Sequence, residues 1–488
     1  FKRLRCFTNM SHPSAPPTRT SSLSTSDLPR RVVDCKYAVR GEVVLKAEEI
    51  QKRLDNNPDL FPFSHLVPCN IGNPQAVGQC PLTFHRQLLA CVAEPSLTNT
   101  TIFPKEVRER AEQYLVGMSN KAGAYSHSKG HLVFRKLIAE YLTERDSFPA
   151  DPEHIFLTDG ASAAVKMVLQ LLVHDGDDGV LLPIPQYPLY SASMTLLGGQ
   201  SVGYFLDESN GWSVDERELE RSIKECRAAG TSPRAIVVIN PGNPTGQVLS
   251  RDVMVRILRI AQRERLVLLA DEVYQDNIHC EEKLFVPFRQ LALEVGITTE
   301  IFSFHSASKG VTGECGLRGG FVHCQNVSSE VMDQLNKLAS ISLCSNVLGQ
   351  ALMASIVTLP PGNSESRARF DAERLHIRNA LKQKAKRVTE RLNQIEGMSC
   401  QAIEGAMYAF PKLNIGGAVL DAALLSGLAP DLVYCLELVE RTGVVAVPGS
   451  GFGQRPGEFH FRITILQDAE VLDKVLDDIE TFHAKFAR

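Results

Sequence analysis

The stretch Ala235-Ile236-Val237-Val238-Ile239-Asn240-Pro241-Gly242-Asn243-Pro244-Thr245-Gly246 joins a continuous apolar run to a loop rich in Asn, Pro and Gly. An unbroken apolar run with several β-branched residues is typical of a strand buried on both faces of a parallel sheet. The loop after it has more fixed residues than a routine turn needs. We therefore predict a buried strand ending in a binding loop, with Asn243 placed to donate a hydrogen bond to a phenolic oxygen.

Similar apolar runs lie on both sides of this strand in the sequence, at 155–158, 179–182, 266–270 and 301–304. The segments between them carry apolar residues at helical spacing, and Ser250 is the expected N-cap of a helix over 250–264. Alternating strands and helices predict an α/β fold with a mainly parallel sheet covered on both faces. Ligands bind beyond the carboxyl ends of the strands in such sheets. The residues that follow each run are therefore the candidates for a site.

The two ends of the chain have a different pattern. A long charged helical segment, short strands and a closing helix follow a proline-rich break at 359–362. Helical spacing at 42–54 predicts a helix near the N-terminus. We expect a smaller mixed domain that shares its core with the N-terminal segment. The expected division is 1–34 as a disordered tail, 35–110 as an N-terminal segment contributing to the small domain, 111–355 as the large ligand-binding domain and 356–488 as the C-terminal small domain.

The N-terminus is basic and rich in Ser, Thr and Pro. Residues 1–31 contain six Lys and Arg against a single Asp. This composition is typical of an organelle transit peptide. We expect residues 1–34 to direct the protein to the mitochondrial matrix. The alternative is a disordered tail without an address on a cytoplasmic protein.

The overall composition favours an enzyme that acts on small molecules. The formal net charge is -4 and the isoelectric point is near 6.4, which gives no reason to expect nucleic acid or an anionic membrane as a partner. No run of about eighteen apolar residues could span a bilayer. The twelve cysteines never form a Cys-x-x-Cys pair, so we expect reduced thiols and no metal site.

Two of the predicted strands are followed by residues suited to a phosphate and a planar ring. Asp159-Gly160-Ala161-Ser162 opens a helix, whose free N–H groups can bind a phosphate, although an ordinary strand-to-helix turn is the alternative. Pro185-Gln186-Tyr187-Pro188 holds Tyr187 on a loop, where its ring can lie against a heterocycle. A core aromatic is the alternative for Tyr187.

A carboxylate follows the run at 266–270 directly, as Asp271, with Tyr274 three residues later. A carboxylate shielded from water is costly unless a cation or a protonated ring nitrogen pairs with it. The hydroxyl of Tyr274 would join Asn243 at a phenolic oxygen. A helix cap is the ordinary alternative for Asp271.

A lysine follows the last run, in Ser303-Phe304-His305-Ser306-Ala307-Ser308-Lys309-Gly310. The amine of Lys309 can form a Schiff base with an aldehyde, while Ser306 and Arg318 can bind a phosphate. This motif alone is weak, because most lysines are solvated surface groups. Combined with the phosphate-binding turn, the aromatic platform, Asn243 and Asp271, it describes pyridoxal 5'-phosphate.

From about residue 37 to residue 486 the sequence resembles the fold-type I pyridoxal-phosphate aminotransferases, and within them the alanine branch in its plant-type form. The matching blocks are 69–75, 123–126, 183–190, 240–246, 270–275, 313–316, 447–453 and 460–462. The resemblance implies a large domain with a mainly parallel seven-stranded sheet and a smaller α+β domain formed by both chain ends. One departure is Val311-Thr312, where an aromatic-containing pair is more usual.

The resemblance also implies how the cofactor is held. Lys309 would be the Schiff-base lysine, Asp271 the partner of the ring nitrogen and Tyr187 the stacking ring. The remaining contacts to the phosphate and the phenolic oxygen would come from Gly160, Ala161, Ser162, Asn243, Tyr274, Ser306 and Arg318.

Substrate and partner contacts are implied in the same way. Arg462 would grip the substrate α-carboxylate as a bidentate pair, in a substrate site shared with Asn243 and Gly72. Tyr125 would reach the phosphate of a neighbouring subunit. This implies an obligate homodimer with shared sites.

The activity implied by the resemblance is a reversible ping-pong transfer of the amino group between L-alanine and 2-oxoglutarate, giving pyruvate and L-glutamate. A close alternative is glutamate:glyoxylate transamination. The C-terminal Phe486-Ala487-Arg488 argues against this alternative, because it lacks a Ser-Lys-Leu-type peroxisomal address. More distant alternatives are a lyase of the same fold and a regulator with an incomplete catalytic set. The glycine-rich 449–453 lacks the strand-to-helix context of a nicotinamide site.

Overall fold

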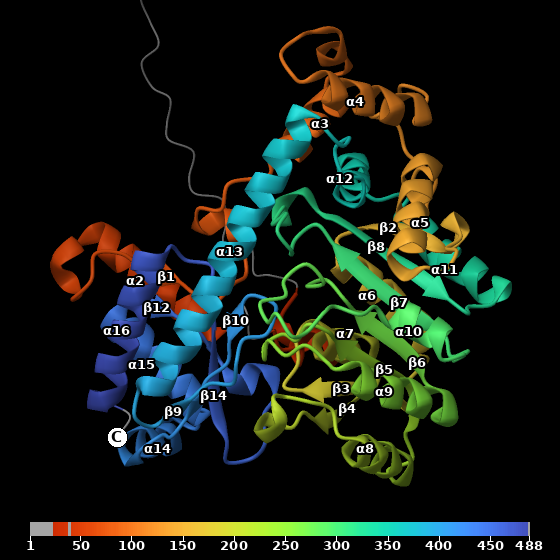
Figure 1. The fold of residues 1–488 in the computed structure, drawn as a ribbon. Coiled ribbons are helices and arrows are strands. Elements are labelled where there is room, and N and C mark those ends of the chain that lie inside the picture. The colour runs from red at the N-terminus through yellow and green to blue at the C-terminus, as the bar shows by residue number, and fades with distance from the viewer. Residues whose placement is uncertain (1–22, 38–40, 487–488) are drawn as a thin grey trace, which may run out of the picture.

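The computed structural model describes residues 23–37 and 41–486 (Figure 1). A seven-stranded sheet lies at its centre, in the order β2-β8-β7-β6-β5-β3-β4. The strands are β2 (Ile155–Asp159), β8 (Gly319–Gln325), β7 (Ile301–Ser306), β6 (Val267–Asp271), β5 (Ser232–Ile239), β3 (Asp178–Ile184) and β4 (Gln200–Phe205). Only β8 runs against its neighbours in this sheet, and the other adjacent strands are parallel. The predicted α/β fold with a mainly parallel sheet is confirmed.

The five predicted strands are present, and two strands are found that the sequence did not predict. β4 lies at the sheet edge, where Gln200 and Ser201 are exposed, so its sequence lacks a continuous apolar run. β8 begins with Gly319-Gly320, and glycine is depleted in strands. Its burial between β2 and β7 makes it a strand in spite of its low intrinsic preference, because tertiary packing outweighs strand propensity.

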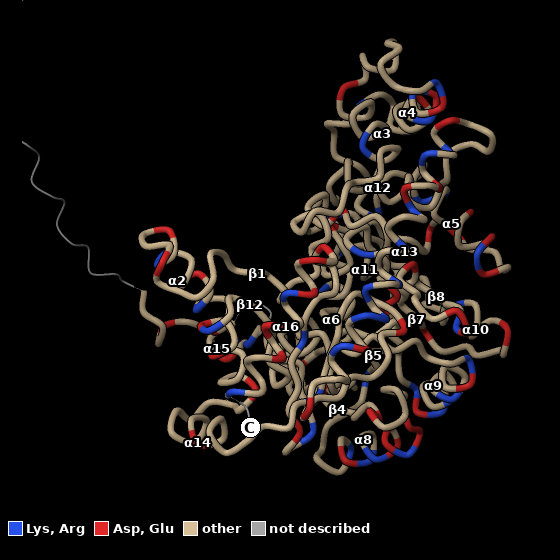
Figure 2. The backbone as a smooth tube through the Cα atoms, turned by 60° about the vertical axis from the view of Figure 1, so that its left-hand side comes forward, with Lys and Arg blue, Asp and Glu red and all other residues tan. Residues whose placement is uncertain are grey.

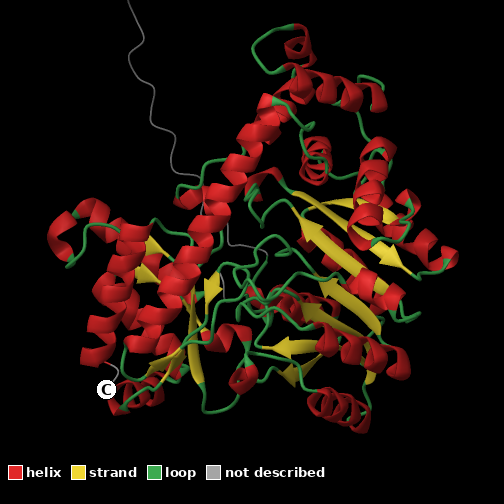
Figure 3. Ribbon diagram, viewed as in Figure 1, coloured by secondary structure: helices red, strands yellow, loops and turns green. Residues whose placement is uncertain are grey.

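Helices cover both faces of the sheet (Figure 3). Successive residues of β5 point to opposite faces, so Ala235 and Val237 join one core while Ile236 and Val238 join the other. The first core includes α6 (Ala161–Leu172), α7 (Leu189–Leu197) and α11 (Ser329–Ile341), and the second includes α8 (Glu216–Ala228), α9 (Arg251–Glu264) and α10 (Phe288–Glu294). Ser250 caps α9 as predicted, its hydroxyl accepting from the Val253 N–H at 3.5 Å.

A third core lies beside β2. It packs α3 (Thr83–Ala93), α4 (Lys105–Gly117), α5 (Leu132–Asp146) and α12 (Val347–Val357) together. From this end α13 (Glu365–Gln394) runs as one 30-residue helix to the smaller part of the molecule (Figure 1). One continuous helix thus connects the two parts.

The smaller part is α+β and draws on both chain ends. α2 (Glu42–Asn56) packs with α15 (Pro430–Thr442) and α16 (Ala469–Phe486), and β1 (Val67–Pro68) pairs in parallel with β12 (Val444–Val445). Three strands pair with β14 (Phe459–Thr464), namely β10 (Tyr408–Ala409), β11 (Lys412–Leu413) and β13 (Val447–Pro448), and β9 (Met398–Ser399) pairs with β11. The predicted fold class is therefore confirmed here as well, whereas the domain boundaries at 34, 110 and 355 stay predictions.

Charges of both signs are interleaved on the outer helices (Figure 2). Arg227 of α8 pairs with Glu264 of α9, and Arg263 of α9 pairs with Glu220 of α8. Within 23–37 and 41–486, no single helix has the length and apolar composition of a membrane span, although α14 (Gly417–Ser426) and α15 reach them when taken together as a pair bent by 104°. The first 22 residues of the expected transit segment lie outside the described residues.

Candidate active site

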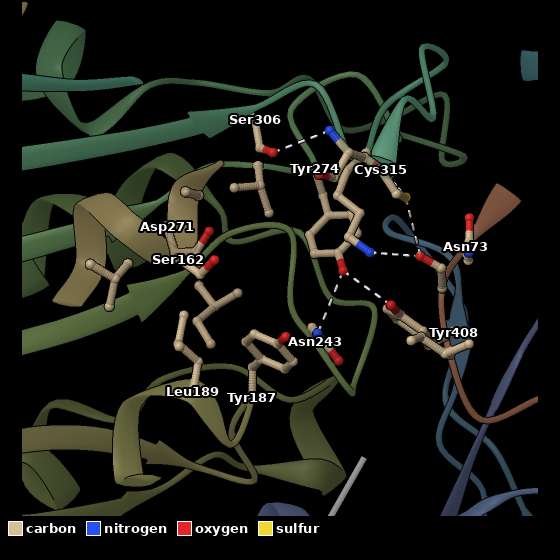
Figure 4. A pocket seen from close by; sticks show the side chains of 18 of the residues that line it. Asn73, Ser162, Tyr187, Leu189, Asn243, Asp271, Tyr274, Ser306, Cys315 and Tyr408 are labelled. Atoms are coloured by element: carbon tan, nitrogen blue, oxygen red, sulfur yellow. Dashed lines mark hydrogen bonds between the residues drawn. The ribbon is translucent and has the colours of Figure 1, made fainter. Parts of the chain in front are cut away.

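A cavity of about 430 Å³ lies at the carboxyl ends of β5, β6 and β7 (Figure 4). This volume is typical of a site for a small ligand. Its wall brings together many of the residues singled out in the sequence: Gly72, Ala161, Ser162, Tyr187, Asn243, Asp271, Tyr274, Ser306, Lys309, Arg318 and Arg462. Gly160 lies directly behind this wall, and Tyr125 lies apart from it.

Lys309 lies in the turn after β7 and lines the middle of the cavity. Its Nζ donates to the carbonyl oxygen of Gly72 at 2.8 Å and lies 5.9 Å from the centre of the Tyr274 ring. No carboxylate is paired with this amine among the salt bridges of the described residues. The Gly72 carbonyl and the Tyr408 hydroxyl hold the amine in the cavity without an ion pair, so little has to be broken before it can react.

Asp271 ends β6 and is 5% exposed. The Tyr190 hydroxyl donates to its Oδ2 at 2.8 Å, while the buried Oδ1 has no hydrogen-bond partner. Burial raises the pKa of Asp271 to about 6, although the Tyr190 hydroxyl, the Val273 backbone N–H and the positive charge of Lys309 lower it. The helix-cap alternative is wrong, because the next helix, α10, begins only at Phe288 with Pro287 before it.

Tyr190 is a contact that the sequence reasoning missed. It ends the matching block 183–190 without a role of its own, yet it lies fully buried in the first turn of α7 with its hydroxyl on Asp271. Its spacing of three from Tyr187 places both side chains on one side of the helix start. This spacing is the sequence signal from which Tyr190 could have been predicted as a site residue.

One end of the cavity is suited to a phosphate. Gly160, at φ 76°, precedes α6, and a side chain there would place its Cβ 2.3 Å from Arg318 Nη2. Arg318 Nη2 donates to the Asp159 carbonyl at 2.9 Å and to Ser162 Oγ at 3.3 Å. A helix N-terminus, a guanidinium and a hydroxyl therefore converge, which is the donor set that a phosphate needs.

Ser306 lies near this end, with its hydroxyl turned to the backbone. Its Oγ donates to the Gly319 carbonyl at 3.2 Å and accepts from the Ser308 N–H at 3.1 Å. The same hydroxyl lines the cavity. Ser306 thus fixes the turn that carries Lys309, and it lines the same cavity as Arg318.

The opposite end holds polar groups suited to a carboxylate and a phenolic oxygen. Asn243 Nδ2 donates to the Tyr274 hydroxyl at 3.5 Å, and Arg462 Nη1 donates to Asn243 Oδ1 at 3.0 Å. Arg462 is 1% exposed and also donates to the Asn70 carbonyl. Asn243 thereby connects a phenol to a buried guanidinium.

Aromatic hydroxyls complete this end. The Tyr187 and Tyr37 hydroxyls lie 2.6 Å apart, and the Tyr274 hydroxyl donates to that of Tyr408 at 3.3 Å (Figure 4). The core-aromatic alternative for Tyr187 holds only in part, because Tyr187 packs against both sheet cores but also lines the cavity. Tyr37 and Tyr408 were not singled out as site residues in the sequence, since neither follows a predicted strand of the large sheet.

The donor set fits pyridoxal 5'-phosphate. The unpartnered Asp271 Oδ1 is the decisive feature, because a buried carboxylate oxygen without a donor is costly and a protonated ring nitrogen would satisfy it. The Arg318 end matches the phosphate and the amine of Lys309 matches the aldehyde. Among the described residues, no group of three or more His, Cys, Asp or Glu side chains could hold a metal ion.

Replacing Tyr190 by Phe tests how Asp271 is held. Loss of the hydroxyl removes a contact that lowers the pKa of Asp271, so a larger share of the carboxyl becomes protonated at pH 7. We expect the dissociation constant for pyridoxal phosphate to rise about threefold to tenfold at pH 7. The difference between the variant and the unchanged protein should shrink toward pH 8.5, where Asp271 is ionised in both proteins. Fluorescence titration of the cofactor-free protein measures both values.

The matched control is Tyr114→Phe, which removes a buried hydroxyl that meets Thr358 in the α3–α4 core. It should bind the cofactor like the unchanged protein. Equal affinity of the Tyr190→Phe protein at pH 7 would show that this hydroxyl does not hold the carboxylate.

Comparison with known proteins gives the family of the chain. A family model described as "Aminotransferase class I and II" matches residues 87–479. Alanine aminotransferase 2 of Panicum miliaceum is 44% identical over 96% of this chain and 98% of its own length, and the mitochondrial alanine aminotransferase 2 of Arabidopsis thaliana is 44% identical over 96% and 89%. Glutamate–glyoxylate aminotransferase 1 of Arabidopsis thaliana is 42% identical over 95% and 96%.

Solved structures agree with this result. The alanine aminotransferase of Pyrococcus furiosus superposes with a TM-score of 0.74 at 26% identity, covering 94% of this chain and 100% of its own. The family match covers more than half of the chain, including every strand of the seven-stranded sheet. The protein therefore belongs to the class I and II aminotransferases.

Proposed function

We propose that this protein is an alanine:2-oxoglutarate aminotransferase, which reversibly transfers the amino group between L-alanine and 2-oxoglutarate to give pyruvate and L-glutamate. The observation that carries the proposal is the placement of Lys309 between two anion sites, Arg318 at one end of the cavity and Arg462 at the other. The relatives at 44% identity that are named alanine aminotransferases support the choice of amino acid.

The residues around the cavity would each hold a different part of the cofactor. Pyridoxal phosphate, the cofactor of this family, supplies an aldehyde for the substrate amine and a ring that accepts electrons from the α-carbon. Ala161, Ser162, Ser306 and Arg318, with Gly160 allowing close approach, would hold its phosphate. Asp271 would pair with its ring nitrogen, Asn243 and Tyr274 would donate to its phenolic oxygen, and Tyr187 would support the ring face.

The substrate is positioned by the smaller part of the chain. Arg462 would bind the α-carboxylate with its planar guanidinium. Asn243 accepts a hydrogen bond from this guanidinium and so fixes one of its edges. Gly72 lines the cavity beside the Lys309 amine, which donates to its carbonyl oxygen, and it would contact the substrate there. The free amine of Lys309 would then take the proton from the substrate α-carbon and later return one.

Changing Lys309 to Ala tests the central assignment. We expect turnover to fall by about a thousandfold or more, because no other amine in the cavity wall can move the α-proton. In the unchanged protein, borohydride reduction should attach the cofactor covalently to Lys309, and peptide mass spectrometry should locate it there. The exposed Lys386→Ala on α13 is the control and should keep full activity.

A substrate panel on the same preparation separates the candidate reactions. The kcat/KM for alanine with 2-oxoglutarate should exceed that for glutamate with glyoxylate by about tenfold or more. The reverse order would favour glutamate:glyoxylate transamination, the activity in the name of a 42% identical relative. Keto acid formed without an amino acceptor would favour a lyase of the same fold.

We propose further that the protein acts as a homodimer with shared sites. Tyr125 is 78% exposed and lies outside its own cavity wall, although the hydroxyl of the neighbouring Ser126 accepts from Gln350 of α12 at 3.0 Å. An exposed tyrosine on an anchored turn is well placed to enter the site of a second copy of the chain, where it would reach the phosphate.

Mixed dimers test this sharing. Coexpressed Lys309→Ala and Tyr125→Ala chains at equal amounts should form heterodimers with one intact site, so that about a quarter of all sites regain full activity. Activity of the mixture equal to the mean of the two parent homodimers would contradict shared sites. Size-exclusion chromatography with light scattering confirms that the chains have mixed as dimers.

We also propose that the protein is imported into mitochondria. The support is the basic, Ser- and Thr-rich segment 1–31 and the word mitochondrial in the names of several relatives. A fluorescent reporter fused to residues 1–34 should be found in mitochondria, and the same segment with its six Lys and Arg changed to Gln should not. A diffuse cytosolic signal from the first fusion would contradict the proposal.

A further inference from the structure

Tyr408 lies where the smaller part of the molecule meets the cavity. It begins β10, it is 2% exposed, and its side chain points into the cavity beside Tyr274 (Figure 4). A Cβ on Gly72 would lie 2.2 Å from the Tyr408 hydroxyl. The backbone at Gly72 therefore closes on this hydroxyl, and the chain leaves no space between them for any larger residue.

The ring of Tyr408 lies against the guanidinium of Arg462. The Arg462 Cζ is 4.1 Å from the centre of the Tyr408 ring and 4.7 Å from that of Phe452. Two aromatic rings and two hydrogen bonds, to Asn243 and to the Asn70 carbonyl, thus fix this guanidinium. Contacts between a desolvated guanidinium and a ring face are stabilising and orient its plane.

The hydroxyl of Tyr408 lies in the field of two cations. Burial would raise the pKa of Tyr408, but the positive charges of Lys309 and Arg462 and the hydrogen bond with Tyr274 outweigh it and lower the pKa. The same Gly72 that touches this hydroxyl also accepts the hydrogen bond from Lys309 Nζ. The hydroxyl, the amine and the Gly72 carbonyl therefore meet in one small space.

We propose that Tyr408 is a positioning residue that couples carboxylate binding to proton transfer: its ring sets the plane of Arg462 and its hydroxyl holds the Lys309 amine at the α-carbon. This inference rests on the proposed aminotransferase function, because it assigns work to Lys309 and Arg462. Tyr408 meets both groups directly, with its ring 4.1 Å from the Arg462 Cζ and its hydroxyl beside the Lys309 amine. A residue that served only to fill the core would have no need of a hydroxyl against Gly72.

The ring and the hydroxyl of Tyr408 can be tested separately. Tyr408→Phe keeps the ring and removes the hydroxyl, so the rate of the amino-transfer half-reaction at saturating amino acid should fall about tenfold. The dissociation constant for the amino acid should change less than about threefold. Tyr408→Leu removes the ring as well, and that dissociation constant should rise about tenfold or more.

Phe452→Leu is the matched control for the ring, because the Phe452 ring also lies against the same guanidinium. It should weaken binding of the amino acid while keeping the half-reaction rate within about threefold of the unchanged protein. Propionate, which has a carboxylate but no amine, gives a second measure of the Arg462 site in the holoenzymes. It should bind Tyr408→Phe normally and Tyr408→Leu weakly.

Stopped-flow measurement of the spectral change of the bound cofactor gives both the rate and the dissociation constant for each variant. An unchanged rate in Tyr408→Phe would overturn the role of the hydroxyl, and unchanged propionate binding in Tyr408→Leu would overturn the role of the ring. If Tyr408→Leu does not fold, Tyr408→Met replaces it as the test of the ring, while Tyr408→Phe still decides the role of the hydroxyl. The reference amino acid is the one that the unchanged protein uses fastest, so failure of the alanine assignment appears separately.

Discussion

A single buried carboxylate constrains the arrangement of this site. Asp271 is 5% exposed at the end of β6, and burial raises its pKa to about 6. Taking an ionised carboxylate out of water costs several kcal/mol unless donors or a cation compensate for it. Because β6 lies between β5 and β7, the compensating groups have to come from those strand ends and from the helix beside them. Lys309 after β7 and Tyr190 in α7 occupy such positions, and both lower the pKa of Asp271.

The same constraint explains why part of the site could be predicted from the sequence. Asn243, Asp271 and Lys309 each follow a continuous apolar run within a few residues, and the carboxyl ends of parallel strands lie at one edge. Tyr408 escaped prediction because its distance from Lys309 depends on how the smaller part packs against the sheet. No local pattern around residue 408 encodes that distance. β4 and β8 were missed for a related reason, since their burial is decided by neighbouring strands.

The site depends on contributions from two parts of the fold. The large sheet provides the phosphate end and the amine, whereas β10 and β14 of the smaller part provide Tyr408 and Arg462. Small shifts between the parts would separate the guanidinium from the amine, and a displacement of about 1 Å can cost two orders of magnitude in rate. The continuous α13 and the close contact at Gly72 both limit such shifts.

The pairing of β1 with β12 sets the order in which the smaller part can be completed during synthesis. β1 leaves the ribosome early, but its partner at 444–445 and the packing helix α16 are made near the end of translation. The apolar face of α2, with Val43, Ile50 and Leu54, has no lasting partner until then. A nascent chain that stalls before residue 444 would therefore expose this helix to chaperones and proteases for as long as the stall lasts.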